Sequence, residues 1–383
     1  LVYYPVGESR NSILHISKPK TEAGVPEYSR RGVPCQGLFA SFCQIFFRFF
    51  SFLPKPRLTL PLLCVKVIGV SFPPGRERRP PVPIYPNIYQ TLLPGPIVEL
   101  RGYLAACGLR GRLYAYLNYN GPTGTARDEL AEGMLALALE RGALTPGQTI
   151  VEAVSGPFAT ALTLAGLTAG HPVTLVMPED APAMRQESLL RLGAQIIHTP
   201  AQAGLAGARA LAKATAAEKG WYYMDWLSND DNPTYHRRVT GPALVRSIAR
   251  EGSSIVDSIV IGVGSGGTIT GVGETVKAWT NDVRIVAVEP YESQALSSGL
   301  TGSHGIPDIG FGLVPGNYNS YVVDNIAAVA TADAVRAAQR VLRTDAIPAS
   351  PSAGAALHAA AQLIANGKSR SALAVFSARQ NIL

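Results

Sequence analysis

The chain has 383 residues, of which 47% are hydrophobic and 16% are charged. This length allows two or three domains with a sizeable buried core, and the composition excludes a disordered or polar-repeat protein. The formal net charge of +7 comes from residues 1–83, where 12 lysines and arginines face 4 glutamates. Residues 84–383 carry a net charge of −1, so the bulk of the chain has no basic surface for a nucleic acid.

Residues 1–83 differ in composition from the rest and predict a separate basic, Phe- and Pro-rich extension. They hold 8 of the 11 phenylalanines and two apolar runs, at 37–53 and 58–72. Arg48 interrupts the first run, whereas a helix that spans a membrane needs about 20 apolar residues. Three hypotheses stay open for this segment: a poorly ordered extension or leader, organelle targeting, and a membrane anchor. Membrane contact would require residues 37–72 to be retained.

Cysteine usage sets the expected compartment. The chain has four cysteines, and none is in a CxxC or Cys/His arrangement. Four cysteines in a chain of this length support neither a disulfide framework nor a zinc site. The sequence therefore favours a reducing, cytoplasmic setting and no metal centre.

Beyond residue 84 the hydrophobic pattern alternates short apolar strands with helices of roughly 10–15 residues. The predicted strands occupy residues 149–154, 172–177, 194–198, 258–263, 283–288 and 371–376. The predicted helices occupy residues 129–141, 160–169, 183–192, 205–219, 234–250, 268–280, 332–343 and 353–365. This alternation predicts an α/β fold with parallel sheets, in which the irregular stretch 226–233 separates two doubly wound halves.

The sharpest motif is a glycine-rich turn between a predicted strand and a predicted helix. Residues 262–268 read Gly-Val-Gly-Ser-Gly-Gly-Thr. Glycines let several backbone N–H groups converge, and the start of a helix attracts an anion. The turn therefore predicts a phosphate site, formed by Gly264, Ser265, Gly266, Gly267 and Thr268.

Local spacing leaves two kinds of phosphate ligand open for this turn. Gly262, Gly264 and Gly267 match GxGxxG, and Glu289 closes the next strand, where an acid that binds a ribose would lie. A dinucleotide is therefore one alternative. However, GxGxxG alone is a weak signal, and here it lies in the second half of the chain, so the surrounding sequence has to decide.

The surrounding sequence resembles the pyridoxal-phosphate-dependent cysteine synthase and cystathionine β-synthase family over most of residues 86–376. Residues 262–273 are similar to its cofactor-phosphate loop, and Ser352 to its serine that faces the pyridine nitrogen. Further similar blocks are residues 88–100, which correspond to the opening strand, and residues 232–242, 286–293 and 304–315. The resemblance implies a two-domain, tryptophan synthase β-like fold (fold type II), pyridoxal phosphate as cofactor, an amino-acid substrate and a homodimer. It argues against a dinucleotide.

The resemblance breaks at the lysine that binds the cofactor covalently. The family has Pro-Gly-Gly-Ser-Val-Lys-Asp-Arg, whereas residues 122–129 read Pro-Thr-Gly-Thr-Ala-Arg-Asp-Glu, which puts Arg127 at the catalytic lysine's position. Covalent attachment needs an amine that can be neutral, and a guanidinium stays protonated. The remaining lysines of this region lie away from every motif: Lys213, Lys219, Lys277 and Lys368. We therefore expect Arg127 to be incompetent for this step, and pyridoxal phosphate, if bound, to be held noncovalently.

The loop that binds the substrate carboxylate in the family is also changed. The family's Thr-Ser-Gly-Asn-Thr-Gly corresponds to Val-Ser-Gly-Pro-Phe-Ala at residues 154–159. Pro157 removes the asparagine side chain and a backbone N–H, and Phe158 places a large ring where a small hydroxyl stood. Ser155 and Gly156 remain as candidate substrate-binding residues.

Other conspicuous residues have simpler explanations than chemistry. We expect His236 to be structural at a helix start, His304 to lie on a loop near the pocket, and Cys107 to pack in the core or at the surface. The adjacent carboxylates Asp230 and Asp231 are explained by a turn or a helix cap.

These observations predict an architecture and three functional hypotheses. Residues 84–110 are expected to join the second domain, residues 111–235 to form a smaller α/β domain, and residues 236–383 a larger one. The first hypothesis is a cysteine synthase-like protein (O-acetylserine sulfhydrylase type) of amino-acid metabolism with impaired β-replacement activity. The alternative is a pseudoenzyme, a non-catalytic cofactor-binding or regulatory partner of an active family member. The third is a degenerate reading frame.

Overall fold

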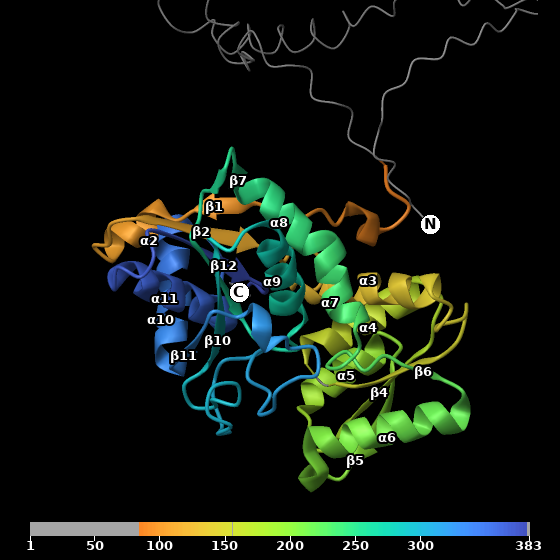
Figure 1. The fold of residues 1–383 in the computed structure, drawn as a ribbon. Coiled ribbons are helices and arrows are strands. Elements are labelled where there is room, and N and C mark those ends of the chain that lie inside the picture. Colours follow the sequence, from red (N-terminus) through yellow and green to blue (C-terminus); the bar gives the residue numbers. More distant parts are fainter. Residues whose placement is uncertain (1–83, 155, 381–383) are drawn as a thin grey trace, which may run out of the picture. The chain divides into compact units, whose positions relative to one another are not determined.

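Residues 84–154 and 156–380 are described by a computed structural model (Figure 1). They belong to one unit of the chain, Val82–Leu383. The predictions for residues 1–83, and for Ser155, lie outside the described residues. Within the described part, no helix is long and apolar enough to cross a membrane.

The larger of the two main sheets has six strands in the order β1-β2-β12-β9-β10-β11. Their bounds are β1 Ile97–Glu99, β2 Arg112–Leu117, β9 Ser258–Gly262, β10 Arg284–Pro290, β11 Asn325–Val329 and β12 Ser371–Phe376. Only β1 runs antiparallel to its neighbour in this sheet, and the other pairs are parallel. Strands that are covered on both faces read as continuous apolar runs, as the SALAVF sequence of β12 does.

The smaller main sheet has four parallel strands in the order β5-β4-β3-β6. Their bounds are β3 Ile150–Ala153, β4 Val173–Pro178, β5 Gln195–Thr199 and β6 Tyr222–Tyr223. A short antiparallel hairpin, β7 (Ala249–Arg250) with β8 (Ser253–Ser254), stands apart from both.

Helices cover both faces of each main sheet. Their bounds are α2 Arg101–Ala106, α3 Arg127–Glu140, α4 Pro157–Thr168, α5 Ala183–Arg191, α6 Gly204–Lys219, α7 Asp231–Tyr235, α8 Gly241–Ile248, α9 Gly267–Trp279, α10 Thr331–Asp345 and α11 Pro351–Ala365. In the smaller sheet Ile150 packs toward α3 and α4, whereas its neighbour Val151 packs toward α6. Successive strand residues point to opposite faces, so this alternation confirms the doubly wound α/β architecture.

Apart from shifts of a few residues at helix ends, two predicted elements differ from the structure. Residues 88–100 are not one opening strand: Ile88–Thr91 is a 3₁₀ turn, and β1 covers only Ile97–Glu99. Residues 92–96 include Pro94 and Pro96, which cannot donate ladder hydrogen bonds. The helix predicted over 234–250 is interrupted by a π-helical turn, His236–Thr240, and ends at Ile248, just before β7 begins at Ala249.

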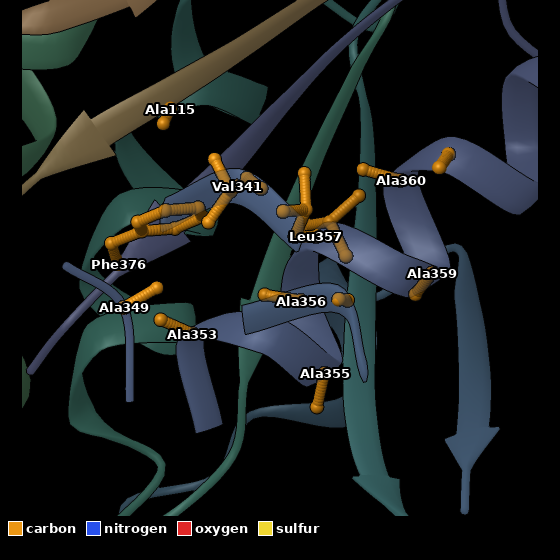
Figure 2. Close-up of a cluster of buried hydrophobic side chains, with 14 of the residues drawn as sticks. Ala115, Val341, Ala349, Ala353, Ala355, Ala356, Leu357, Ala359, Ala360 and Phe376 are labelled. Carbon is orange, nitrogen blue, oxygen red and sulfur yellow. The ribbon is translucent and has the colours of Figure 1, made fainter. Parts of the chain in front are cut away.

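On one face of the larger sheet, the core is built mainly from small side chains. Leu357 and a series of alanines on α11 pack against α10 and the sheet, and Phe376 at the end of β12 fills the space between them (Figure 2). Gly354 allows this close packing, since a Cβ there would lie 2.1 Å from the carbonyl oxygen of Ala334 on α10. The alanine-rich α11 sequence is therefore explained by helix–helix contact.

Phe376→Ala is expected to lower the free energy of unfolding by about 3–5 kcal/mol, because Phe376 is fully buried and its removal leaves a cavity. Urea unfolding followed by circular dichroism measures this loss. Leu300→Ala is the control: Leu300 is 68% exposed, and its change is expected to stay within about 0.5 kcal/mol of the parent. A similar loss in both variants would contradict the packing described here.

Candidate functional site

The glycine turn predicted from the sequence connects β9 to α9. Gly266, the residue that precedes the helix, has φ of +82°, a conformation that glycine adopts readily. A Cβ at Gly264 would lie 2.3 Å from the carbonyl oxygen of Asp308, and one at Gly267 would lie 1.7 Å from Oδ1 of Asn232. Close packing therefore requires these glycines, in addition to any role they have toward an anion.

A buried histidine orients one hydroxyl of this turn. His236 Nε2 lies 3.1 Å from Oγ1 of Thr268, and its Nδ1 lies 2.9 Å from Oγ1 of Thr240. Burial lowers the pKa of His236 to about 3, so the ring is neutral at physiological pH. Asn232 holds the second hydroxyl, since its Nδ2 donates to Ser265 Oγ at 3.0 Å. His236 begins the π-helical turn after α7, contacts the motif through Thr268 and lines the cavity beside it.

The turn lines a small cavity of about 40 Å³, together with Arg127 and Trp226. A cavity that holds one water needs about 10–15 Å³ by this measure, so the space suits about three waters or one phosphate-sized group. Ser352 is buried on the first turn of α11, and its hydroxyl lies 2.8 Å from that of Ser350. Ser352 does not line this cavity, although its carbonyl oxygen approaches Gly262.

Arg127 is the first residue of α3 and is buried beside the glycine turn. Its Nη1 lies 3.7 Å from Oδ2 of Asp308, and its guanidinium donates to the carbonyl oxygens of Ser377 at 3.4 Å and Asp308 at 3.3 Å. The side chains of Arg127 and Asp308 are 10% and 6% exposed. The structure therefore places a paired, buried cation at the wall of the phosphate-sized cavity.

An aromatic cluster closes the other side of the site. The rings of Phe158 and Trp226 stack with centroids 4.5 Å apart, and Phe311 meets Trp226 edge-on at 5.8 Å. Glu152, buried at the end of β3, fixes Trp226 by accepting its backbone N–H at 2.9 Å. Pro157 and Phe158 are the first two residues of α4, because proline fits the first position of a helix. The predicted substrate loop is thus the start of a helix.

A second cavity, of about 640 Å³, adjoins these residues. Arg127, Trp226 and Asp308 line both cavities, and Gly156 lines the larger one. None of the lysines in the described part of the chain lines either cavity. The two cavities therefore share a cation, a carboxylate and an indole, but no amine.

The sequence alone did not single out several of these residues. Trp226 fell in the irregular stretch, and Asp308 and Phe311 lie in a block that was matched without a role. Arg379 and Glu152 also line or support the site. Only Arg379 carried a signal in the sequence, since it lies just after the predicted strand 371–376, at the edge where ligands bind in such folds.

The remaining candidates have structural partners. Asp230 and Asp231 begin α7 without a side-chain cap and instead pair with Arg237 and Arg141, both at 2.7–2.8 Å. His304 holds its own loop through the carbonyl oxygen of Gly310 at 2.8 Å. Half-buried Cys107 accepts from Arg340 at 3.1 Å. Asp230 lies in the predicted turn, at the N-cap position of α7, but the carboxylates of both aspartates form ion pairs in place of a side-chain cap.

Glu289, the acid that the dinucleotide alternative would use, is buried, and its carboxylate forms hydrogen bonds with nearby residues of the chain. Its carboxylate accepts the backbone N–H of Leu296 at 2.8 Å and the hydroxyl of Ser297. These contacts give Glu289 a structural role in the turn that follows β10. Among the residues described, no group of three or more His, Cys, Asp or Glu side chains could hold a metal ion.

Comparison with known proteins identifies the family. A model described as pyridoxal-phosphate dependent enzyme matches residues 88–377. The chain belongs to this family. It is 34% identical over 276 residues to a cysteine synthase of Staphylococcus aureus, which covers 72% of this chain and 87% of that protein. The resemblance inferred from the motifs is confirmed, and pyridoxal phosphate is the cofactor that membership implies.

Solved structures confirm the fold type II architecture. A cysteine synthase from Entamoeba histolytica has a TM-score of 0.72 and 31% identity, over 79% of this chain and 89% of that chain. An O-ureido-L-serine synthase has a TM-score of 0.71 and 27% identity, over 78% and 92% of the two chains.

The residues of the site fit one part of pyridoxal phosphate, its phosphate group. The cradle between β9 and α9 has the hydroxyls, the glycines and the space for a phosphate group. The covalent attachment has no counterpart, because no lysine of the described residues lines either cavity. The site therefore fits the phosphate of pyridoxal phosphate and lacks an amine for its aldehyde.

Glu152→Gln is expected to change how stability depends on pH. Burial raises the pKa of Glu152 to about 8 from an ordinary value of 4.5, so the folded protein holds a proton that the unfolded chain releases between these values. The free energy of unfolding should therefore fall as pH rises through this window. In Glu152→Gln, which cannot ionise, that contribution to the slope should vanish.

Urea unfolding at several pH values within this window measures the slope. Glu218→Gln, which removes an exposed carboxylate from α6, should keep the parent slope. An unchanged slope in Glu152→Gln would show that burial does not hold the proton on Glu152.

Proposed function

We propose that this protein is a cysteine synthase-like member of the family that binds pyridoxal phosphate noncovalently and has lost ordinary β-replacement activity. The observation that carries the proposal is the position of Arg127, a buried guanidinium paired with Asp308 beside the phosphate cradle. A guanidinium cannot become the neutral amine that covalent attachment requires. The motif resemblance places Arg127 where active relatives have the lysine.

The residues that would hold the cofactor are those of the predicted site. The backbone N–H groups from Gly264 to Thr268 would bind the phosphate, and Ser352 would face the pyridine nitrogen. When bound, pyridoxal phosphate supplies an electron sink for carbanion chemistry. Gly156 and Ser155 would contact an amino-acid substrate. The protein would act as a homodimer in the cytoplasm, which is consistent with the low cysteine content.

A second candidate function is a non-catalytic cofactor-binding or regulatory partner of an active family member. The aromatic stack of Phe158 on Trp226 favours it, because the stack occupies the start of α4, where the family's substrate loop lies. Under this hypothesis the cofactor stabilises the fold and no turnover occurs.

Pyridoxal phosphate is expected to bind at the glycine turn without a covalent link. Isothermal titration should show binding that Gly266→Asp abolishes, because a Cβ at Gly266 would lie 2.8 Å from the backbone nitrogen of Tyr318 and would displace the turn. Thr268→Val, which keeps the turn, should weaken binding about tenfold through loss of one hydrogen bond to a charged group. Borohydride treatment followed by mass spectrometry should leave every lysine unmodified.

Thr301→Asp, on an exposed loop, is the control for an added carboxylate and should bind like the parent. Equal affinity of the parent and both turn variants would refute the phosphate site. A lysine that carries a reduced pyridoxyl phosphate group after borohydride treatment would refute noncovalent binding.

Arg127→Lys is expected to restore a covalent link to pyridoxal phosphate, seen as a visible absorbance band, with little sulfhydrylase turnover. Pro157 and Phe158 separately remove the groups that would orient a substrate carboxylate, and orientation alone can contribute about 7–11 kcal/mol. Arg127→Lys combined with Pro157→Asn and Phe158→Thr should therefore exceed the single variant by orders of magnitude, since groups of one catalytic unit act non-additively. Full turnover by Arg127→Lys alone would show that residues 154–159 do not limit activity.

A further inference from the structure

The 640 Å³ cavity has an apolar wall and a cationic rim, and this combination points to a ligand class. Its size lies within the roughly 300–1,000 Å³ of small-molecule sites. We propose that it binds a small organic acid that has an aromatic or branched apolar body, one anionic group and no amino group. This inference deepens the proposed function and rests on it: Gly156 lines this cavity, and a protein that has lost ordinary turnover of amino acids is free to bind another acid there.

Three arginines and one carboxylate supply all the charge of the cavity lining. Arg127 is buried and paired with Asp308, whereas Arg185 at the start of α5 and Arg379 after β12 are exposed. Neither Arg185 nor Arg379 forms a salt bridge within the described part of the chain. The rim therefore has two uncompensated positive charges, which favour an anion.

The buried guanidinium has donors to spare for such an anion. A guanidinium carries five N–H groups, and two of Arg127's contacts are hydrogen bonds of 3.3 and 3.4 Å to the carbonyl oxygens of Asp308 and Ser377. The Asp308 carboxylate is 3.7 Å away, longer than a charge-assisted hydrogen bond of about 2.7–2.9 Å. A carboxylate in the cavity can therefore accept from Arg127 without breaking its existing pair.

The rest of the cavity lining suits an apolar body. It is formed by Val154, Phe158, Val176, Met177, Leu205, Ala208, Trp226, Leu227 and Phe311. Phe158 is fully buried and stacks on Trp226, and Glu152 fixes the backbone of Trp226, so the aromatic part of the lining is formed before a ligand arrives. A rigid aromatic surface binds apolar groups at a low cost in conformational entropy.

The lining also disfavours the ammonium group of an amino acid. Asp308 is the one acidic residue of the cavity lining, and Arg127 already neutralises it. An ammonium would have to lie among three arginines without a carboxylate of its own. The start of α4 at Gly156 and Pro157 adds the positive end of a helix to the cavity lining.

Isothermal titration of the full chain with three probes tests the proposal: phenylbutyrate, its neutral amide, and L-phenylalanine. Phenylbutyrate is expected to bind at least about tenfold more tightly than either of the others, because only it pairs with the rim without an ammonium. Arg185→Ala combined with Arg379→Ala should weaken phenylbutyrate about tenfold and leave the amide unchanged. Both positions are exposed, so the fold should be retained.

The matched control is Arg343→Ala, an exposed arginine of α10 outside the cavity lining, which should bind phenylbutyrate like the parent. Thr268→Val should also bind it normally, although it weakens pyridoxal phosphate, so failure at the phosphate turn can be distinguished from failure here. Equal affinity for the acid and its amide, tighter binding of L-phenylalanine, or no effect of the double arginine variant would overturn the proposal.

Discussion

The buried guanidinium of Arg127 is the charge around which the site is arranged. A buried charge without a partner destabilises a fold by about 3–5 kcal/mol, so Arg127 must be paired. Its partners are Asp308, in the loop after β10, and the carbonyl oxygen of Ser377, just after β12. The backbone of Asp308 in turn closes on Gly264 so tightly that only glycine fits. Pairing of one side chain therefore ties the start of α3, the end of β12 and the loop at Asp308 to the phosphate turn.

Most of the fold follows from local patterns and could be predicted from the sequence. Apolar strand runs such as β12, and helices whose apolar faces meet a sheet, are set by residues close together in the chain. The glycine turn was found because its backbone demands, including φ of +82° at Gly266, are local as well. The helix starts were predicted less well, since proline at the first position moved α4 and α11 forward to Pro157 and Pro351. The proposed domain boundaries stay a prediction.

The long-range contacts of the site could not be predicted in the same way. Arg127 and Asp308 are 181 residues apart, and nothing in either segment names the other as its partner. Phe158 and Trp226 likewise stack across 68 residues of chain, with the Trp226 backbone held by Glu152, Asn232 and Asn317 from three other segments. The family resemblance could assign a residue to a motif. It could not predict the 640 Å³ cavity or its charged lining, because these depend on which distant side chains the fold brings together.

An arginine where the resemblance places a lysine changes what the site can select as well as what it can catalyse. A lysine amine can lose its proton and attack, whereas a guanidinium remains a fixed cation with planar donors. Arg127 lines both the small cavity at the glycine turn and the 640 Å³ cavity, so its positive charge acts on a ligand in either one. Pro157 and Phe158 act in the same direction, because they exchange polar groups for apolar surface beside that cation. Under the two proposals above, the same three residues would both prevent covalent attachment and favour apolar anions.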